Sequence, residues 1–498
     1  MLNKFYYERS NLLESEVNIN FEELLWMDDD QTTKWIDNLR EFILYEWDNF
    51  GVPPTIGQNT KDLKKNFRKL RDYPLHQGRK QFLTKDEDTG EYDVIKNYNK
   101  FASGVNQFFP TMLKTKIGTK KNATSIYDYF TDKYRDSFHK IIRRTFKRDS
   151  MYSWSKCIKG TGSGVGWIAN NQDKYFFIVQ QSKEKNPEHL ILNSDEIIKL
   201  FDVDLIDERH ITNLPEFDKL NDSKYSYFIR EFELGQKIFP PGIQAFRLGL
   251  GQPAVNFPAL TARWIYEYYT DHIKQAGPLI IYDPSAGWGG RILGAMSSHK
   301  KIHYIGTDPN TDNFIDELGI TRYEYVANFF NDEVLETNPF WEEERNTYHI
   351  FQDGSELIGN NPDFQQYKGE LDLVFTSPPY FDREQYSDDS EQSFRAYPTY
   401  EDWRDNFLKP TLINAFGSLK KDRYLLWNIA SIKIGKNKYH PLEEDSINII
   451  ESLGGEYSGK LKMLMTTMTG LNPENVKNCV KVNGSYRKYE PIFVFHKK

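Results

Sequence analysis

The loop at residues 377–380 has the residue types with the clearest chemistry. Residues 371–381 read LDLVFTSPPYF, an apolar run that predicts a buried parallel strand and stops at two prolines. Because proline lacks an N–H and fixes φ, the strand must end there and the loop must be stiff. Ser377 and the Pro378 carbonyl can accept hydrogen bonds, and Tyr380 offers a flat ring. Such a loop suits a flat group that bears an amine. The acceptors would hold the two amine hydrogens and so favour the pyramidal, reactive form of the amine. The alternative is a proline-rich turn without chemistry.

A second pattern follows another predicted strand. Residues 279–291 read LIIYDPSAGWGGR, in which an apolar strand leads to Asp283 and then to glycines that open a helix. Gly287 and Gly289 would allow the backbone to approach a ligand closely, and the helix N-terminus would supply free N–H groups. The spacing differs from the dinucleotide fingerprint, because Ile292 stands where its third glycine would be.

Two acids end the next predicted strands. Residues 302–308, IHYIGTD, end in Asp308, which is placed to bind ribose hydroxyls. Residues 347–353, TYHIFQD, end in Asp353, which is placed to accept from an adenine amino group. Further strands are predicted at 371–376 and 424–429, with a late antiparallel edge strand at 489–495. Helices between the strands predict alternating βα units and a mostly parallel sheet.

Together these motifs resemble a known enzyme family. The sequence TSPPY resembles the (D/N/S)PP(Y/F/W) motif of the amino-group DNA methyltransferases, and the glycine loop resembles that of class I S-adenosylmethionine-dependent methyltransferases. The resemblance covers roughly residues 250–498. It implies an α/β, Rossmann-like class I methyltransferase domain at 241–498. A large, mainly α or α+β region at 1–240 would precede it and serve in DNA binding and target recognition.

The resemblance also assigns residues to roles. The catalytic residues would be Ser377, Pro378, Pro379 and Tyr380. S-adenosylmethionine would be bound by Asn256, Phe257, Asp283, Pro284, Ala286, Gly287, Gly289, Asp308, Asp353 and Thr376. In this family a helix that follows a short motif such as Asn256-Phe257-Pro258 helps to hold the methionine end of the cofactor.

The implied reaction is direct methyl transfer to an exocyclic amine of a base that has left the DNA stack. Serine at the first motif position favours N4 of cytosine slightly over N6 of adenine. A cytosine-C5 reaction needs a cysteine nucleophile, usually after proline, whereas Cys157 follows Lys156 and Cys479 lies near the end of the chain. Two alternatives stay open: an RNA or protein amino-group methyltransferase, and a nucleic-acid-binding protein with a retired catalytic domain.

Composition adds limits on compartment and partners. A chain of 498 residues predicts two or three domains, and two cysteines with no long apolar run predict a cytoplasmic protein without a disulfide framework. No metal site is expected. The net charge is −8, yet residues 51–160 carry 24 Lys+Arg against 11 Asp+Glu. This basic segment favours DNA as the partner, and a restriction nuclease is a candidate companion. A solvated lysine-rich surface is the alternative.

Two details of the basic segment allow opposite interpretations. Residues 61–70, KDLKKNFRKL, predict a short basic amphipathic helix, which could belong to a helix–turn–helix or be a plain surface helix. In the first case its phosphate-facing residues would be Lys64, Lys65, Arg68 and Lys69. Asn106, Gln107, Phe108 and Phe109 are candidates for stacking and base-edge contacts, or else the paired phenylalanines belong to the core.

Overall fold

The computed structural model describes residues 28–50, 60–75, 82–95, 103–117, 124–140, 254–337, 345–381, 384–385, 393–435, 438–469, 471, 473–474 and 476–498. The chain forms two compact units. One consists of Met1–Asn59 and Ile126–Gln252, and the other of Thr60–Ser125 and Pro253–Lys498. The second unit contains the sheet and every motif described above, and is called the catalytic unit below after the predicted catalytic residues that it contains.

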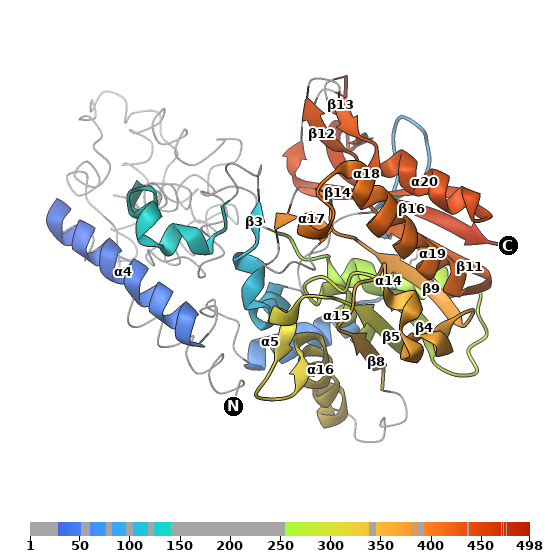
Figure 1. The fold of residues 1–498 in the computed structure, drawn as a ribbon, viewed down its shortest axis with the longest axis horizontal. Helices are drawn as coiled ribbons and strands as arrows, with labels where there is room; N and C mark the ends of the chain where they lie inside the picture. Colours follow the sequence, from blue (N-terminus) through green and yellow to red (C-terminus); the bar gives the residue numbers. More distant parts are fainter. Residues whose placement is uncertain are drawn as a thin grey trace, which may run out of the picture. The chain divides into compact units, whose positions relative to one another are not determined.

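Five parallel strands form the centre of the catalytic unit (Figure 1). They are β4 (Leu279–Asp283), β5 (Ile302–Thr307), β8 (Thr347–Phe351), β9 (Leu371–Thr376) and β11 (Leu419–Asn428). Their order across the sheet is β8-β5-β4-β9-β11, and each neighbouring pair is parallel. All five strand predictions are therefore confirmed.

The last strand is not at an edge, which corrects the prediction for 489–495. Strand β16 (Ser485–Lys497) lies between β11 and β14 (Gly455–Thr469) and is antiparallel to both. Its residues 492–495 are buried, as expected for an internal strand. Strand β14 was missed because lysines and glycines interrupt its apolar pattern.

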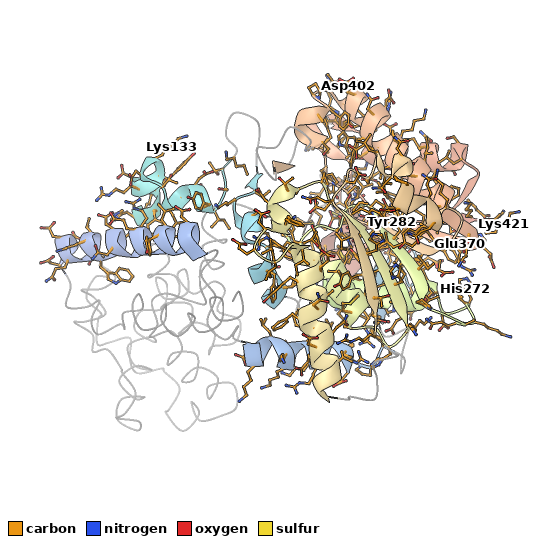
Figure 2. All side chains as sticks on the ribbon, turned by 60° about the horizontal axis from the view of Figure 1, so that its bottom comes forward. Lys133, His272, Tyr282, Glu370, Asp402 and Lys421 are labelled. Atoms are coloured by element: carbon orange, nitrogen blue, oxygen red, sulfur yellow. The ribbon has the colours of Figure 1, made fainter. Side chains whose placement is uncertain are left out.

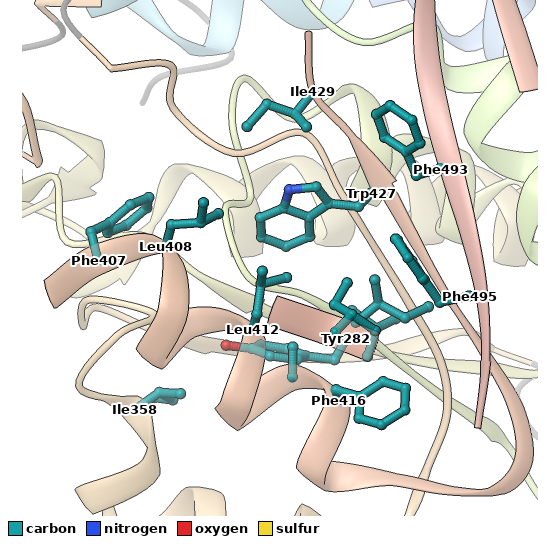
Figure 3. Close-up of a cluster of buried hydrophobic side chains, with 14 of the residues drawn as sticks. Tyr282, Ile358, Phe407, Leu408, Leu412, Phe416, Trp427, Ile429, Phe493 and Phe495 are labelled. Atoms are coloured by element: carbon teal, nitrogen blue, oxygen red, sulfur yellow. The ribbon is translucent and has the colours of Figure 1, made fainter. Parts of the chain in front are cut away.

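Helices cover both faces of the sheet. Phe375 of β9 contacts Tyr266 of α14 (Ala259–Tyr269), and α14 packs on α15 (Gly290–Met296), which packs on α16 (Arg322–Thr337). Side chains alternate along a strand, so Val374 points to the other face. There it joins a buried cluster that includes Tyr282, Leu412, Phe416, Trp427, Phe493 and Phe495 (Figure 3). Helices α19 (Lys409–Ser418) and α20 (Leu442–Ser452) cover that side.

Shorter elements complete the catalytic unit. They are β6 (Phe314–Ile315), β7 (Ile320–Thr321), α17 (Ser393–Ala396), α18 (Tyr400–Trp403), the π-helical turn η11 (Arg404–Leu408), β12 (Ile432–Gly435), β13 (Lys438–His440) and β15 (Cys479–Val482). Single 3-10 turns lie at η7 (Thr311–Asn313), η9 (Ile358–Asn360) and η10 (Pro362–Tyr367).

The basic helix packs into the catalytic unit. Helix α5 (Thr60–Arg71) buries Leu63, Phe67 and Leu70, and the Phe67 ring lies 4.7 Å from the Phe330 ring of α16. The buried guanidinium of Arg263, on α14, donates to the carbonyl oxygens of Leu70 and Arg71, both at 2.7 Å. Arg263 thereby satisfies the open carbonyl end of α5, the end at which a helix favours a cation.

Two of the basic side chains on α5 have an acidic partner. Lys64 Nζ lies 3.3 Å and Arg68 Nε 3.2 Å from the buried Glu333 carboxylate of α16. These two residues therefore support docking of the helix, which differs from the predicted phosphate-facing role. Residues 60–125 carry 15 Lys+Arg against 7 Asp+Glu, so much of the basic surplus belongs to the catalytic unit. The predicted division at residue 240 differs from this packing.

A hairpin from the same N-terminal part extends the sheet. Strand β2 (Val94–Ile95) pairs in parallel with β14, and β1 (Leu83–Thr84) pairs with β2. Lys462 of β14 lies between the carboxylates of Asp86 and Asp93, at 2.6 and 2.7 Å. This largely buried ion-pair group fixes the hairpin to the sheet.

The other unit is described only at two segments. Helix α4 (Asp29–Phe50) lies beside the 3-10 turns η3 (Tyr127–Phe130) and η4 (Asp132–Tyr134). Arg40 Nη1 donates to the Phe130 carbonyl oxygen at 2.9 Å, and Arg135 makes two hydrogen bonds to Asp37. Most of the predicted 1–240 recognition region lies outside the described residues. Within the described part of the chain, no helix is long and apolar enough to cross a membrane.

Candidate active site

The predicted catalytic and cofactor loops meet at the point where the strand order reverses. After β4 the chain builds β5 and β8 on one side, and then returns to place β9 on the other side of β4. Asp283 ends β4 and Thr376 ends β9. The Thr376 hydroxyl donates to Asp283 Oδ1 at 2.7 Å, which joins the two loops at their origin. Open α/β sheets bind their ligands in such a crevice at the carboxyl ends of the strands.

The opposite edge of the sheet has a different character. His272 precedes β4, Glu370 precedes β9 and Lys421 lies early in β11, and all three are exposed (Figure 2). Figure 2 also shows Tyr282 within the body of the sheet. Every predicted site residue except Asn256 and Phe257 lies on or just after the carboxyl end of a strand.

Asp283 is fully buried, and protein groups occupy its carboxylate. Oδ2 accepts from Arg291 Nε at 2.7 Å and from the Tyr304 hydroxyl at 2.6 Å, and Oδ1 accepts from the Ser285 N–H as well as from Thr376. Burial alone would lower the pKa of Arg291, but the Asp283 charge outweighs it and the pKa is raised. Asp283 therefore stabilises the glycine loop through hydrogen bonds within the protein, and its predicted part in cofactor binding would be indirect.

The glycine loop has a conformation and surroundings that demand glycine. Gly287 and Gly289 have φ angles of 65° and 78°, the left-handed region that side chains disfavour. Gly290 was not among the predicted residues, yet a Cβ there would overlap the Phe257 carbonyl oxygen. The loop is also fixed to β5, because the Thr307 hydroxyl donates to the Pro284 carbonyl oxygen at 2.5 Å. The Ala286 N–H donates to the Thr307 carbonyl oxygen at 2.9 Å.

Asn256 and Phe257 support this loop. The Asn256 side chain accepts from the Gly290 N–H at 3.0 Å and donates to the Trp288 carbonyl oxygen at 2.5 Å. The Phe257 ring is buried 5.1 Å from the Phe375 ring. Both residues thus lie next to the predicted cofactor loop, with the Asn256 amide committed to protein partners.

A segment from the N-terminal part of the catalytic unit covers the glycine loop. It contains the 3-10 turns η1 (Ser103–Phe108) and η2 (Pro110–Leu113), and its Asn106 accepts from Asn256 Nδ2 at 2.9 Å. The Phe109 ring packs edge-on against Trp288, and a Cβ on Gly289 would lie 2.5 Å from Phe109 Cε2.

The phenylalanine pair of this segment belongs to the core. Phe109 is 0% and Phe108 4% exposed, and the Phe108 ring lies 5.5 Å from the Phe329 ring of α16. The core interpretation is correct, and the base-stacking interpretation of both rings is wrong, because neither ring is accessible to a base. Beyond η2, β3 (Lys116–Ile117) pairs with β10 (Glu384–Gln385), just after the TSPPY loop. One segment therefore reaches both loops of the site.

Asp308 is half-buried after β5, and its carboxylate is partly engaged. Oδ2 accepts from the Tyr323 hydroxyl and from Asn313 Nδ2, and Oδ1 accepts from the Asn310 N–H. These bonds use three of the roughly four acceptor positions of a carboxylate. Burial raises the pKa of Asp308, although the three hydrogen bonds oppose that shift. The Tyr323 hydroxyl also lies 2.5 Å from the Gly287 carbonyl oxygen, so Tyr323 connects the glycine loop to the predicted ribose-binding acid.

Asp353 is half-buried two residues after β8, which ends at Phe351. Its Oδ1 accepts from the Gly354 N–H at 2.9 Å, and its Oδ2 lies 3.4 Å from Asn361 Nδ2. The carboxylate keeps acceptor capacity, which suits the predicted contact to an adenine amino group.

The predicted catalytic loop begins immediately after β9. Ser377 and Pro379 are half-buried, Pro378 is buried, and the residue after Tyr380, Phe381, packs into the core cluster. The Tyr380 hydroxyl donates to Glu490 Oε1 at 2.5 Å and accepts from the Ala430 N–H at 3.1 Å. The loop is thus attached at both ends, by the Thr376–Asp283 hydrogen bond and by Tyr380.

Sequence reasoning missed several residues that shape this site. Arg291 and Gly290 stand within the glycine-loop pattern and could have been singled out from it. Tyr323 and Glu490 come from distant parts of the chain, and no spacing pattern connects them to the motifs. Asn106, a predicted base-edge candidate, forms a hydrogen bond with Asn256. Among the described residues, no group of three or more His, Cys, Asp or Glu side chains could hold a metal ion.

Comparison with known proteins finds no matching family model and no matching curated protein. Among solved structures, a candidate DNA modification methylase from Thermus thermophilus matches at 17% identity and a TM-score of 0.18, covering 29% of this chain and 49% of that one. A candidate RNA methyltransferase from Pyrococcus horikoshii matches at 13% identity and a TM-score of 0.23, covering 48% and 83%. A methyltransferase from Methanosarcina mazei that is described as SAM-dependent matches at 10% identity and a TM-score of 0.25, covering 47% and 96%. The chain spans about half the length of the Thermus protein.

The sheet itself gives the fold. Five parallel strands in a doubly wound order and an antiparallel last strand inserted beside the fifth form a mixed, mostly parallel α/β sheet. The catalytic unit has a fold that resembles the class I, S-adenosylmethionine-dependent methyltransferases.

Proposed function

We propose that this chain is a DNA methyltransferase that transfers a methyl group from S-adenosylmethionine to an exocyclic amine of a base. N4 of cytosine is slightly favoured over N6 of adenine. One observation carries the proposal: the Ser-Pro-Pro-Tyr loop starts at the carboxyl end of β9, hydrogen-bonded through Thr376 to the acid that holds the glycine loop. This position at the switch point of a doubly wound sheet favours the catalytic interpretation over a proline-rich turn without chemistry.

Three features at the carboxyl edge suit the cofactor. Gly287 has a half-buried backbone with a positive φ, and because it lacks a side chain of its own, a ligand could approach its backbone closely. Asp308 keeps about one acceptor position for a ribose hydroxyl, and Asp353 keeps acceptor capacity for an adenine amino group. When bound, S-adenosylmethionine supplies a methyl group that is already activated on a sulfonium.

The chain's own contribution to the reaction is alignment. Ser377 and the Pro378 carbonyl would accept the two hydrogens of the target amine, and Tyr380 would stack on the base that carries it. These groups would bring the amine lone pair into line with the methyl group. Fixed acceptors placed where charge develops supply most of the acceleration in such a reaction.

The charge distribution favours a nucleic acid as substrate. Residues 51–160 carry 24 Lys+Arg against 11 Asp+Glu, and both compact units receive part of that surplus. A basic surface provides the salt-dependent phosphate contacts on which non-specific DNA binding depends. The proposed reader of the DNA sequence is the region 1–240, and a restriction nuclease is the proposed companion.

Methyl transfer can be tested directly. The full chain would be incubated with tritiated S-adenosylmethionine and duplex DNA, structured RNA or a mixed protein extract. The DNA would then be digested to nucleosides for mass analysis. We expect N4-methylcytosine or N6-methyladenine in the DNA only, and loss of the label with a Ser377→Ala, Tyr380→Ala double variant. Label in RNA or protein alone would replace DNA as the substrate, and full activity of the double variant would refute the assignment.

A further inference from the structure

The hydroxyl of Tyr380 is held by two groups outside its own loop. It donates to Glu490 Oε1 at 2.5 Å and accepts from the Ala430 N–H at 3.1 Å. Glu490 lies on β16, and Ala430 follows the end of β11. The half-buried ring packs against the hydrophobic cluster that surrounds Tyr282 and Trp427. The ring is therefore attached at its base by the loop and at its tip by these hydrogen bonds.

The register of the sheet explains why the two groups converge. Strands β11 and β16 are antiparallel, with Asn428 opposite Ile492. Continuing this register by two residues places position 430 opposite Glu490. The side-chain amide of Asn428 donates to the Pro491 carbonyl oxygen at 2.9 Å, which fixes this end of the strand pair. The inserted last strand thus delivers a carboxyl group to the edge where the catalytic loop lies.

The environment of Glu490 favours a hydrogen bond to the protein. Burial raises the pKa of the Glu490 carboxyl, while the hydrogen bond from Tyr380 and the charge of Lys488 oppose the shift. Glu490 is half-buried, and the Tyr380 hydroxyl gives its carboxyl a donor within the protein. No part of the proposed reaction requires a carboxylate here, so the residue has no other evident task.

We propose that Glu490 is a positioning residue, which together with the Ala430 N–H holds the Tyr380 hydroxyl and so fixes the plane of the ring. This inference rests on the proposed function, in which that ring stacks on the target base. A ring fixed before the base arrives loses less rotational freedom on stacking, so more of the contact contributes to alignment.

The matched variants are Glu490→Gln, Glu490→Leu and Tyr380→Phe. Glutamine keeps an oxygen that can accept from the hydroxyl, leucine does not, and phenylalanine keeps the ring without the hydroxyl. We expect Glu490→Leu and Tyr380→Phe each to slow single-turnover methyl transfer about tenfold, and the double variant to be no slower than either. Glu490→Gln should stay close to wild type. S-adenosylmethionine affinity, measured by calorimetry, should be unchanged in all of them.

A second readout does not depend on activity. With 3-fluorotyrosine incorporated at position 380, the ¹⁹F resonance reports the surroundings and order of the ring. We expect Glu490→Leu to shift and average this resonance, and Glu490→Gln to preserve it. An unchanged resonance, a wild-type rate in Tyr380→Phe, or additive losses in the double variant would overturn the inference. Absence of methyl transfer by the wild-type chain would refute the proposed function instead, and the resonance would still decide the role of Glu490.

Discussion

The two loops that meet at the end of β4 and β9 are held in very different ways. In the glycine loop, Asp283 is fully buried, Gly290 abuts Phe257 and Gly289 abuts Phe109, while Gly287 is half-buried. In the catalytic loop, Ser377, Pro379 and Tyr380 stay half-buried. The predicted cofactor loop is thus packed into the core at most of its positions, whereas the predicted catalytic loop keeps an accessible surface. Changes in the first should cost stability, and changes in the second should cost rate.

The largest effect should come from removing the segment that covers the glycine loop. A chain that starts at residue 253 lacks α5, the β1–β2 hairpin and Phe109. Burial of Leu63, Phe67 and Leu70 alone contributes about 1.5–3 kcal/mol each, which together rivals the whole stability of a typical domain. We expect this truncated chain to show no cooperative thermal transition by circular dichroism.

The control for this truncation keeps both parts of the catalytic unit. Residues 60–125 joined by a Gly/Ser linker to residues 253–498 should melt cooperatively and resist chymotrypsin. A stable, cofactor-binding fragment that starts at residue 253 would show that the N-terminal segment is only an accessory.

What the sequence could predict depends on whether a feature is local in the chain or formed by residues that are distant in sequence. Strands β4, β5, β8, β9 and β11 are local features, since each is an apolar run with a stop signal, and the acids at their ends follow from counting along the chain. The docking of α5 depends on Arg263 and Glu333, which lie far from it in sequence. A spacing pattern contains no information on such a contact, so the sequence alone did not place the basic helix in the catalytic unit.

Strand β16 shows the same limit within the sheet. Its apolar pattern was recognised, but its place between β11 and β14 depends on β14, whose 15 residues include lysines and glycines. Without β14, the last strand could only be predicted at an edge of the sheet. Glu490 therefore could not be predicted as a partner of Tyr380, because only the correct strand order brings β16 to the catalytic loop.

Replacing Asp283, the acid that precedes the glycine loop, should have the next largest effect. Asp283→Ala leaves the buried Arg291 guanidinium without its carboxylate and removes the link to Thr376. Loss of one partner from a buried ion pair costs about 3–5 kcal/mol. Urea unfolding should show this loss, with weaker S-adenosylmethionine binding as a consequence. An Asp283→Ala variant as stable as wild type would mean that the loop does not depend on this carboxylate.

A glycine pair tests close packing separately from charge. A Cβ at position 290 would overlap the Phe257 carbonyl oxygen, whereas one at position 277 would have no heavy atom within 4 Å. We expect Gly290→Ala to cost about 1–3 kcal/mol by overpacking, and Gly277→Ala to be neutral. The two melting temperatures give the comparison, and equal values would contradict the packing described for the loop.

In the catalytic loop the expected loss moves from stability to rate. Tyr380→Ala removes the stacking surface, which contributes about 1–3 kcal/mol per base in comparable contacts. Single-turnover methyl transfer should fall accordingly, with cofactor affinity close to wild type because the glycine loop is untouched. Loss of cofactor binding in this variant would show instead that the two loops form one rigid structure.

Ser377→Ala should have the smallest effect and the most specific one. The side chain is half-buried, so its removal leaves little cavity, and the Pro378 carbonyl remains as the second acceptor for the target amine. Loss of one hydrogen bond of about 0.5–1.5 kcal/mol predicts a rate that falls roughly two- to tenfold, while the melting temperature and the affinity for S-adenosylmethionine stay unchanged. Single-turnover kinetics at saturating cofactor isolate that step. A Ser377→Ala variant that lost stability instead of rate would show that Ser377 stabilises the fold, as the residues of the glycine loop do. The residues of the catalytic loop that affect only the rate would then begin at Pro378, and not directly after Thr376.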